Sequence, residues 1–136
     1  MASKGQARTI KPIQSVAPAL INATATGSAV DTKGYEGVTV VIDAGVRTDG
    51  THTPKLQETI EDPASPGNPL ASGWADVAAA DLLGSFAAIT SNTLQWVGYR
   101  GVKRFVRVVV TVVAGATGAT YGAVVVVGLP GKAATS

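Results

Sequence analysis

The 136 residues suffice for one domain with its own core, and the lack of cysteine excludes disulfides and thiolate metal sites. A formal net charge of +2 is too small to indicate nucleic acid as the partner. The most apolar run, residues 119–129, is shorter than the roughly 20 residues of a spanning helix, which argues against a membrane protein. No apolar stretch follows Lys4 and Arg8, so we expect no secretory signal and synthesis in a cytoplasm.

The N-terminal segment, residues 1–19, is predicted to be an extended basic arm. It contains Lys4, Arg8 and Lys11 but no acidic residue. Two interpretations stay open, a frayed tail and an arm that becomes ordered only against a partner.

The first strong strand signal comes at residues 38–44, where two valines, an isoleucine and an alanine share one face. The following Asp49-Gly50 pair is a hairpin-type turn signal, so we expect residues 55–59 to pair back on this strand. Residues 62–69 hold three prolines, which exclude a helix or a central strand. They predict a surface excursion.

The next segments return to the sheet. Residues 74–77 resume strand structure, residues 78–86 are the only helix candidate, and residues 94–99 form another strand. Trp74 and Trp96 are predicted to be core residues at the junction of two sheets, with a role as interface anchors as the alternative.

Two valine-rich runs, residues 105–113 and 119–129, dominate the last third of the chain. β-branched residues suit a pleated sheet, and a turn of small residues separates the runs, so we expect a long hairpin. In the first run all even positions from 106 to 112 are valine, which predicts one fully apolar face. The second run is apolar on both faces, and this excess predicts that something else lies on it.

Seven to nine strands at spacings near ten residues indicate an all-β fold, an antiparallel β-sandwich that is jelly-roll-like. The expected organisation is the arm at residues 1–19, the sandwich at 20–130 and a C-terminal tail at 131–136.

Nothing in the sequence indicates catalysis. The single histidine, His52, lies near Asp49 in a predicted turn, and we interpret it as a solvated loop residue rather than a catalytic base. One histidine and scattered acids do not offer converging metal ligands, and no glycine-rich phosphate motif follows a strand. We therefore expect no enzyme, no cofactor and no metal site.

One basic and aromatic cluster surrounds the start of the first valine run. A nucleic-acid interpretation is disfavoured, because only two aromatics are available and the charge is nearly balanced. Protection of a strand edge and binding to an acidic protein surface both stay open. The cluster comprises Tyr99, Arg100, Lys103, Arg104, Phe105 and Arg107.

An ordered set of short motifs runs from Gly34 to Leu129, about seventy per cent of the chain. The motifs are Gly34–Thr39, Pro54–Glu58, Trp74–Val77, Asp81–Gly84 and Val97–Val109. Each motif is weak alone, since it fixes strands and turns rather than chemistry. As an ordered set they resemble the capsid cement (decoration) proteins of tailed phages, which are encoded beside the major capsid protein.

The resemblance implies a jelly-roll-like sandwich on the outside of an HK97-type shell, with the major capsid protein as partner and a homodimer bridging capsomers. It carries over no functional residues, so the candidate contacts come from charge and apolarity alone. A receptor- or glycan-binding sandwich of a phage tail or fibre is the alternative, and a single-stranded nucleic-acid binder is a third. Candidate capsid contacts are Lys4, Arg8, Lys11, Arg100, Lys103 and Arg104, and candidate dimer-interface residues are Tyr121, Val124 and Val126.

Overall fold

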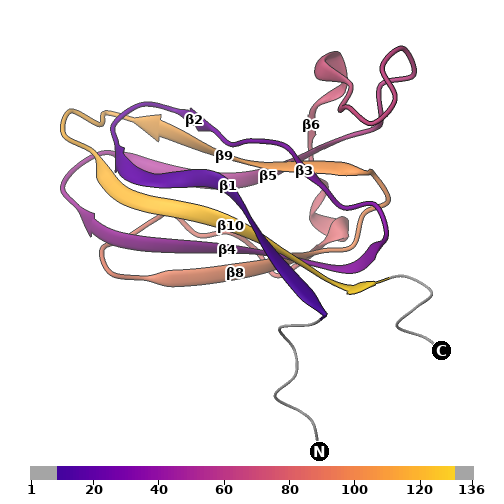
Figure 1. The fold of residues 1–136 in the computed structure, drawn as a ribbon. Coiled ribbons are helices and arrows are strands. Elements are labelled where there is room, and N and C mark those ends of the chain that lie inside the picture. Colours follow the sequence, from indigo (N-terminus) through magenta and orange to yellow (C-terminus); the bar gives the residue numbers. More distant parts are fainter. Residues whose placement is uncertain (1–8, 131–136) are drawn as a thin grey trace, which may run out of the picture.

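Two antiparallel sheets packed face to face make up the described part of the chain, residues 9–130, in the computed structural model (Figure 1). Sheet A has the order β1-β10-β4-β8-β7 and sheet B the order β2-β9-β5-β6, with β3 also paired to β9. The strands of sheet A are β1 (Ile10–Ile21), β10 (Ala119–Pro130), β4 (Tyr35–Arg47), β8 (Leu94–Tyr99) and β7 (Leu82–Leu83). Those of sheet B are β2 (Ala25–Thr26), β3 (Val30–Asp31), β9 (Phe105–Val113), β5 (Thr51–Thr59) and β6 (Ala75–Asp76). The predicted all-β sandwich is confirmed.

Strands early in the sequence pair with strands late in the sequence, and the pairs are nested. β1 pairs with β10, β2 and β3 with β9, β4 with β8, and β5 with β6, every pair antiparallel. This nested order of first with last, divided between two sheets, is the jelly-roll arrangement. The jelly-roll prediction therefore also describes the connectivity.

Inward-facing branched residues of both sheets fill the core. The predicted apolar face of β4 is buried, and the valines of β9 at 106, 108 and 110 are fully buried against it. The valines of β10 at 125 and 127 are also fully buried. Rigid β-branched side chains on two pleated surfaces interdigitate well, which explains the valine content.

The predicted terminal hairpin is wrong. β9 lies in sheet B and β10 in sheet A, so the small-residue turn between them crosses the sandwich, where Ala114 and Gly118 adopt positive φ angles of 58° and 101°. The predicted return of residues 55–59 onto β4 is wrong for the same reason, since β5 pairs with β9. The strands on either side of each turn lie in different sheets, so their apolar faces pack against each other across the core.

The predicted N-terminal arm is wrong for residues 10–19, which belong to β1 and pair with β10. Ile13 and Val16 anchor this strand in the core. Prolines are tolerated here because an edge strand leaves one row of its N–H groups unpaired. Residues 1–8 and the predicted tail at 131–136 lie outside the described residues.

Residues 60–74 project from one end of the sandwich, as the proline content predicts (Figure 1). The excursion is internally hydrogen-bonded: the Gly67 amide donates to Glu61 Oε2 at 2.6 Å and the Asp62 amide to the Asn68 carbonyl at 2.8 Å. Within residues 9–130 the helical segments are single 3₁₀ turns, η2 (Ala71–Gly73) and η3 (Ala79–Asp81), the latter inside the predicted helix candidate.

Neither tryptophan is the core residue that the sequence predicts. Trp96 on β8 is 67% exposed on the outer face of sheet A. Trp74 is half-buried and lies outside the core, where the Arg107 guanidinium stacks 4.2 Å from its ring centre. The segment 94–99 is apolar on both faces, so alternation alone does not say which face turns inward.

Candidate functional site: the apolar outer face of sheet A

The outer face of sheet A is a largely apolar surface built from the five strands of the sheet. The register places three cross-strand rows on it, and residues directly opposite each other share a face. The first row is Pro12, Val126, Thr39, Gly98 and Leu83; the second is Gln14, Val124, Val41 and Trp96; the third is Gly122, Asp43 and Leu94. Leu83, Leu94 and Trp96 are among the most exposed large apolar side chains in the described chain.

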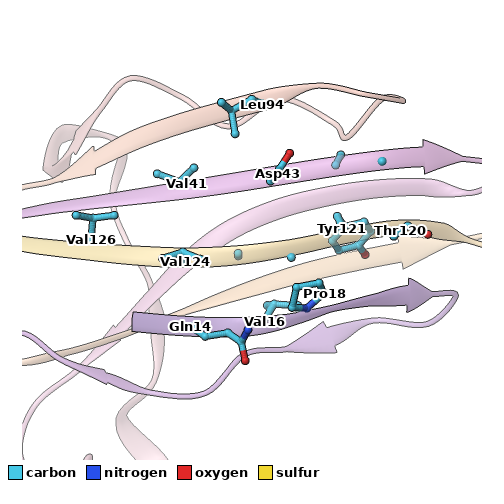
Figure 2. A pocket seen from close by; sticks show the side chains of 14 residues that line it. Gln14, Val16, Pro18, Val41, Asp43, Leu94, Thr120, Tyr121, Val124 and Val126 are labelled. Carbon is cyan, nitrogen blue, oxygen red and sulfur yellow. The ribbon is translucent and has the colours of Figure 1, made fainter. Parts of the chain in front are cut away.

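A hollow of about 570 Å³ lies in this face between β1, β10 and β4 (Figure 2). Two features of the strands create it. β1 loses its regular register at bulges on either side of Val16, and β10 has a glycine, Gly122, where a side chain would otherwise fill the space. Pro18 lies over that glycine, and a Cβ added there would meet the proline ring at 3.0 Å. The hollow is therefore a consequence of the backbone.

One charged residue lines the hollow. Asp43 is exposed, opposite Leu94, and within the described residues its carboxylate makes no hydrogen bond or ion pair. The remaining lining is apolar apart from Gln14 and Thr120 (Figure 2). A mostly apolar concavity with a few polar groups is the usual lining of a binding site.

The edges of sheet A are less open to a partner than its face. Along β1, Pro12 and Pro18 lack amide hydrogens and two bulges interrupt the ladder. On the opposite side, the Gln95 side chain holds the backbone of Ala87 with two hydrogen bonds of 2.9 and 3.0 Å. Prolines, bulges and covered edges disfavour the addition of another strand. Binding at this sheet should therefore use side chains on the face.

The predicted capsid contacts are only partly assembled. Lys4 and Arg8 lie outside the described residues, whereas Lys11 is exposed on β1. Lys11 pairs with Val127, and the same cross-strand row continues through Val38 to Tyr99. Three strand spacings separate Lys11 from Tyr99, so Lys11 lies about 14 Å from the start of the 100–104 loop. The structure thus places Lys11 at the same end of the sandwich as Arg100 and Lys103.

Arg104 is not a free cation. Its guanidinium pairs with Asp31 at 2.8 Å and with Glu61 at 3.0 Å, and its pKa is raised chiefly by the hydrogen bond to Asp31. Arg100 donates from Nε to the Ala80 carbonyl at 3.1 Å. These two arginines fix loops at the end of the sandwich, which leaves Lys11 and Lys103 as the exposed members of the predicted set whose charges have no partner among the described residues.

Tyr121 is not at the surface, contrary to the predicted interface. Its side chain is 1% exposed because it shares the inward face of β10 with Ala123 and Val125, and burial raises its pKa to about 12. Val124 and Val126 do lie on the outer face, half-buried beside the hollow. The predicted homodimer stays a prediction.

His52 is fully buried, so its interpretation as a solvated loop residue is wrong. Its Nε2 lies 3.0 Å from the Asp49 carbonyl and its Nδ1 lies 3.0 Å from the Tyr121 hydroxyl. A carbonyl only accepts, so Nε2 carries the proton and Tyr121 donates to Nδ1. The pair joins β5 of one sheet to β10 of the other.

Asp43, Leu94 and Trp96 were not recognised as one common site from the sequence. Period-2 alternation along residues 39–43 and 94–98 does group them, but only the register shows that the two groups meet. Within residues 9–130 no three histidine, cysteine, aspartate or glutamate side chains converge as a metal site, and no helix is long and apolar enough to span a membrane.

Comparison with known proteins adds little to this geometry. No protein-family model and no curated protein sequence matches the chain. A chain in the solved structure of the infectious bursal disease virus Gx strain is similar over 90% of this chain, with 12% identity and a TM-score of 0.43. The present chain spans about a third of that longer chain, 32% of its length. The functional assignment therefore has to come from the molecule itself.

Proposed function

We propose that this chain is a non-enzymatic structural protein of a phage virion, a cement that binds the outside of an HK97-type capsid and stabilises the shell. The observation that carries the proposal is the uncovered apolar face of sheet A. Contiguous apolar patches of this kind mark interaction surfaces on soluble proteins. The fold suits such a role, because jelly rolls recur in viral capsid domains.

The size of the face is adequate for a specific contact. Four strands spaced about 4.8 Å apart and about nine residues long cover roughly 600 Å². A standard protein interface uses about 800 Å² of each partner, so the face and its rim supply most of the area required.

A cement acts by mass action. It binds the assembled shell and not the free subunits, so the shell gains stability equal to the binding free energy. Repetition over many identical sites multiplies the effect. Lys11, Lys103 and other surface cations facing capsid acids would add no more than about 1 kcal/mol each, and salt would screen them.

The test is co-sedimentation of the purified protein with undecorated shells of its phage. Leu94→Asp places a charge on the apolar face at a residue that is 57% exposed, so folding should survive while shell binding is lost. Val113→Asp is the matched control, since Val113 is 61% exposed but belongs to sheet B. Equal binding of both variants would refute the role of sheet A, and wild-type protein that stays in the supernatant would refute the cement function.

The exposed Trp96 favours one second candidate, a glycan-binding sandwich of a tail or fibre, because sugar rings stack on exposed indoles. Retention on a glycan array, lost in Trp96→Ala, together with no binding to shells, would put this candidate first.

A further inference from the structure

The carboxylate of Asp43 is a difficulty for any partner that covers sheet A. It lies among Val41, Leu94 and the empty position of Gly122, in the third cross-strand row of the apolar face. In the free protein, water solvates it, because the side chain is exposed and has no partner among the described residues. A partner that covers the face removes that water.

Covering an unpaired charge is strongly unfavourable. Desolvation of an ionised carboxylate costs several kcal/mol unless a hydrogen-bonded counter-charge replaces the water. The polar neighbours in the hollow, Gln14 and Thr120, are neutral. Since no described residue supplies a cation in the hollow, the counter-charge has to come from the partner.

We propose that the segment that covers the outer face of sheet A is apolar and carries one arginine, whose guanidinium pairs with Asp43 beside the Trp96 indole. The inference rests on the proposed function in that it names the chemistry of the capsid segment at this same face. Arginine fits for two reasons: its planar fork binds a carboxylate through two parallel hydrogen bonds, and its face stacks on an aromatic ring.

The register supplies both halves of this site. Asp43 pairs with Leu94, and Trp96 is two residues further along β8, so the carboxylate and the indole are diagonal neighbours on one face. Diagonal neighbours lie about 7–8 Å apart, within the reach of one guanidinium that contacts both. Trp96 is exposed enough to offer its ring to an incoming side chain.

A second copy of this chain fits the face less well. In a two-fold dimer the same surface is presented by both copies. The charged residue that lines the hollow would then be Asp43 in each copy, and neither copy would supply a cation there. Charge complementarity thus favours a different protein over self-association at this face.

The first test compares Asp43→Asn with Glu36→Gln in the shell-binding assay. Both remove one exposed carboxylate from β4, but only Asp43 lines the hollow. We expect Asp43→Asn to weaken binding about 30-fold, the loss typical of breaking a covered charge pair, and Glu36→Gln to bind like wild type. Wild-type affinity of Asp43→Asn for shells would overturn the arginine proposal while leaving the cement function intact.

The second test does not need shells. Wild-type protein is titrated, with detection by NMR, against a short valine- and threonine-rich peptide containing one arginine and against the same peptide with citrulline. We expect shifts at Asp43, Leu94 and Trp96 with the arginine peptide, and their loss in Asp43→Asn. Equal responses to the two peptides would overturn the proposal, as would a wild-type dimer that Leu94→Asp separates into monomers in sedimentation.

Discussion

The two outer faces of the sandwich are built from the same kind of strand, but they differ in how many of their charged and polar side chains have partners. On sheet B, Lys55 pairs with Asp76 at 3.0 Å, and Gln57 links Asp76 to Arg107 by hydrogen bonds of 2.8 to 3.0 Å. Trp74 covers Arg107 on the far side. Sheet A offers valine, leucine and tryptophan side chains around one unpaired carboxylate. On sheet B the polar groups bind one another, whereas sheet A leaves large apolar side chains and the Asp43 carboxylate exposed to water.

The largest expected effect lies between the two faces, in the core. Val108→Asp places a charge where both sheets meet, at a fully buried residue, and should cost several kcal/mol of a total stability of about 5–15. We expect no soluble folded protein. Thr111→Asp, on the exposed side of the same strand, should change the free energy of unfolding by less than about 0.5 kcal/mol. A soluble Val108→Asp protein with an unchanged Tm would mean that the faces of β9 are reversed.

The next effect concerns the bond that joins the two sheets. Tyr121→Phe removes the hydroxyl that donates to His52 Nδ1 and leaves a buried acceptor unpaired, so we expect a loss of about 1–3 kcal/mol in urea unfolding. Tyr35→Phe, at a half-buried residue of β4, is the control and should be nearly neutral. If both variants lose equal stability, the cross-sheet hydrogen bond contributes nothing specific.

The two tryptophans sharpen the comparison of the faces directly. Trp74→Ala removes the cation–π contact with Arg107 and should cost about 1–2 kcal/mol. Trp96→Ala should change stability by less than about 0.5 kcal/mol, because most of the side chain is already in water. Thermal unfolding of the pair measures the difference. A larger loss for Trp96→Ala would show that the face of sheet A is already covered in solution.

The smallest effect is a pH dependence that belongs to sheet B and the sandwich ends. The hydrogen bond from Arg104 lowers the pKa of Asp31, that from Gln57 lowers the pKa of Asp76, and the amide of Gly118 lowers the pKa of Asp49. A lowered folded pKa stabilises the fold above the unfolded value of about 3.9 and loses that contribution as pH falls. Tm should therefore be level above about pH 5 and decline below pH 4.

Asp31→Asn is the variant that isolates one of these groups. Its Tm should decline less steeply below pH 4 than that of wild type. The difference in the free energy of unfolding should be under about 1 kcal/mol, because the pair with Arg104 is partly exposed. Identical pH profiles would mean that Asp31 does not contribute to the pH dependence of Tm.

Strand existence could be predicted from the sequence, but strand pairing could not. Alternation identified β4, β8, β9 and β10 because each has one continuous apolar face. The turns at Asp49-Gly50 and at 114–118 carry hairpin signals, yet both lead from one sheet to the other. Local turn chemistry specifies a reversal of direction, and the choice of partner depends on residues far away in the chain.

The site was predictable only in part. His52 alternates with Leu56 on the buried face of β5, a signal that was present but outweighed by the nearby turn residues. β1 was missed because prolines and polar residues conceal an edge strand. Val124 and Val126 were found because a strand that is apolar on both faces needs cover on both. Asp43 and Trp96 become neighbours only through the register of β4 with β8.

The pairing of β1 with β10 has a consequence for biosynthesis. During translation β1, β4 and β8 leave the ribosome long before β10, the strand that belongs between β1 and β4. Until residue 130 emerges, β1 and β4 of the nascent chain each have an edge with no neighbour, and such edges invite pairing with other chains. Sheet A can close only after β10 has been synthesised, so its folding should be slow, as expected when the decisive contacts join residues far apart in the sequence.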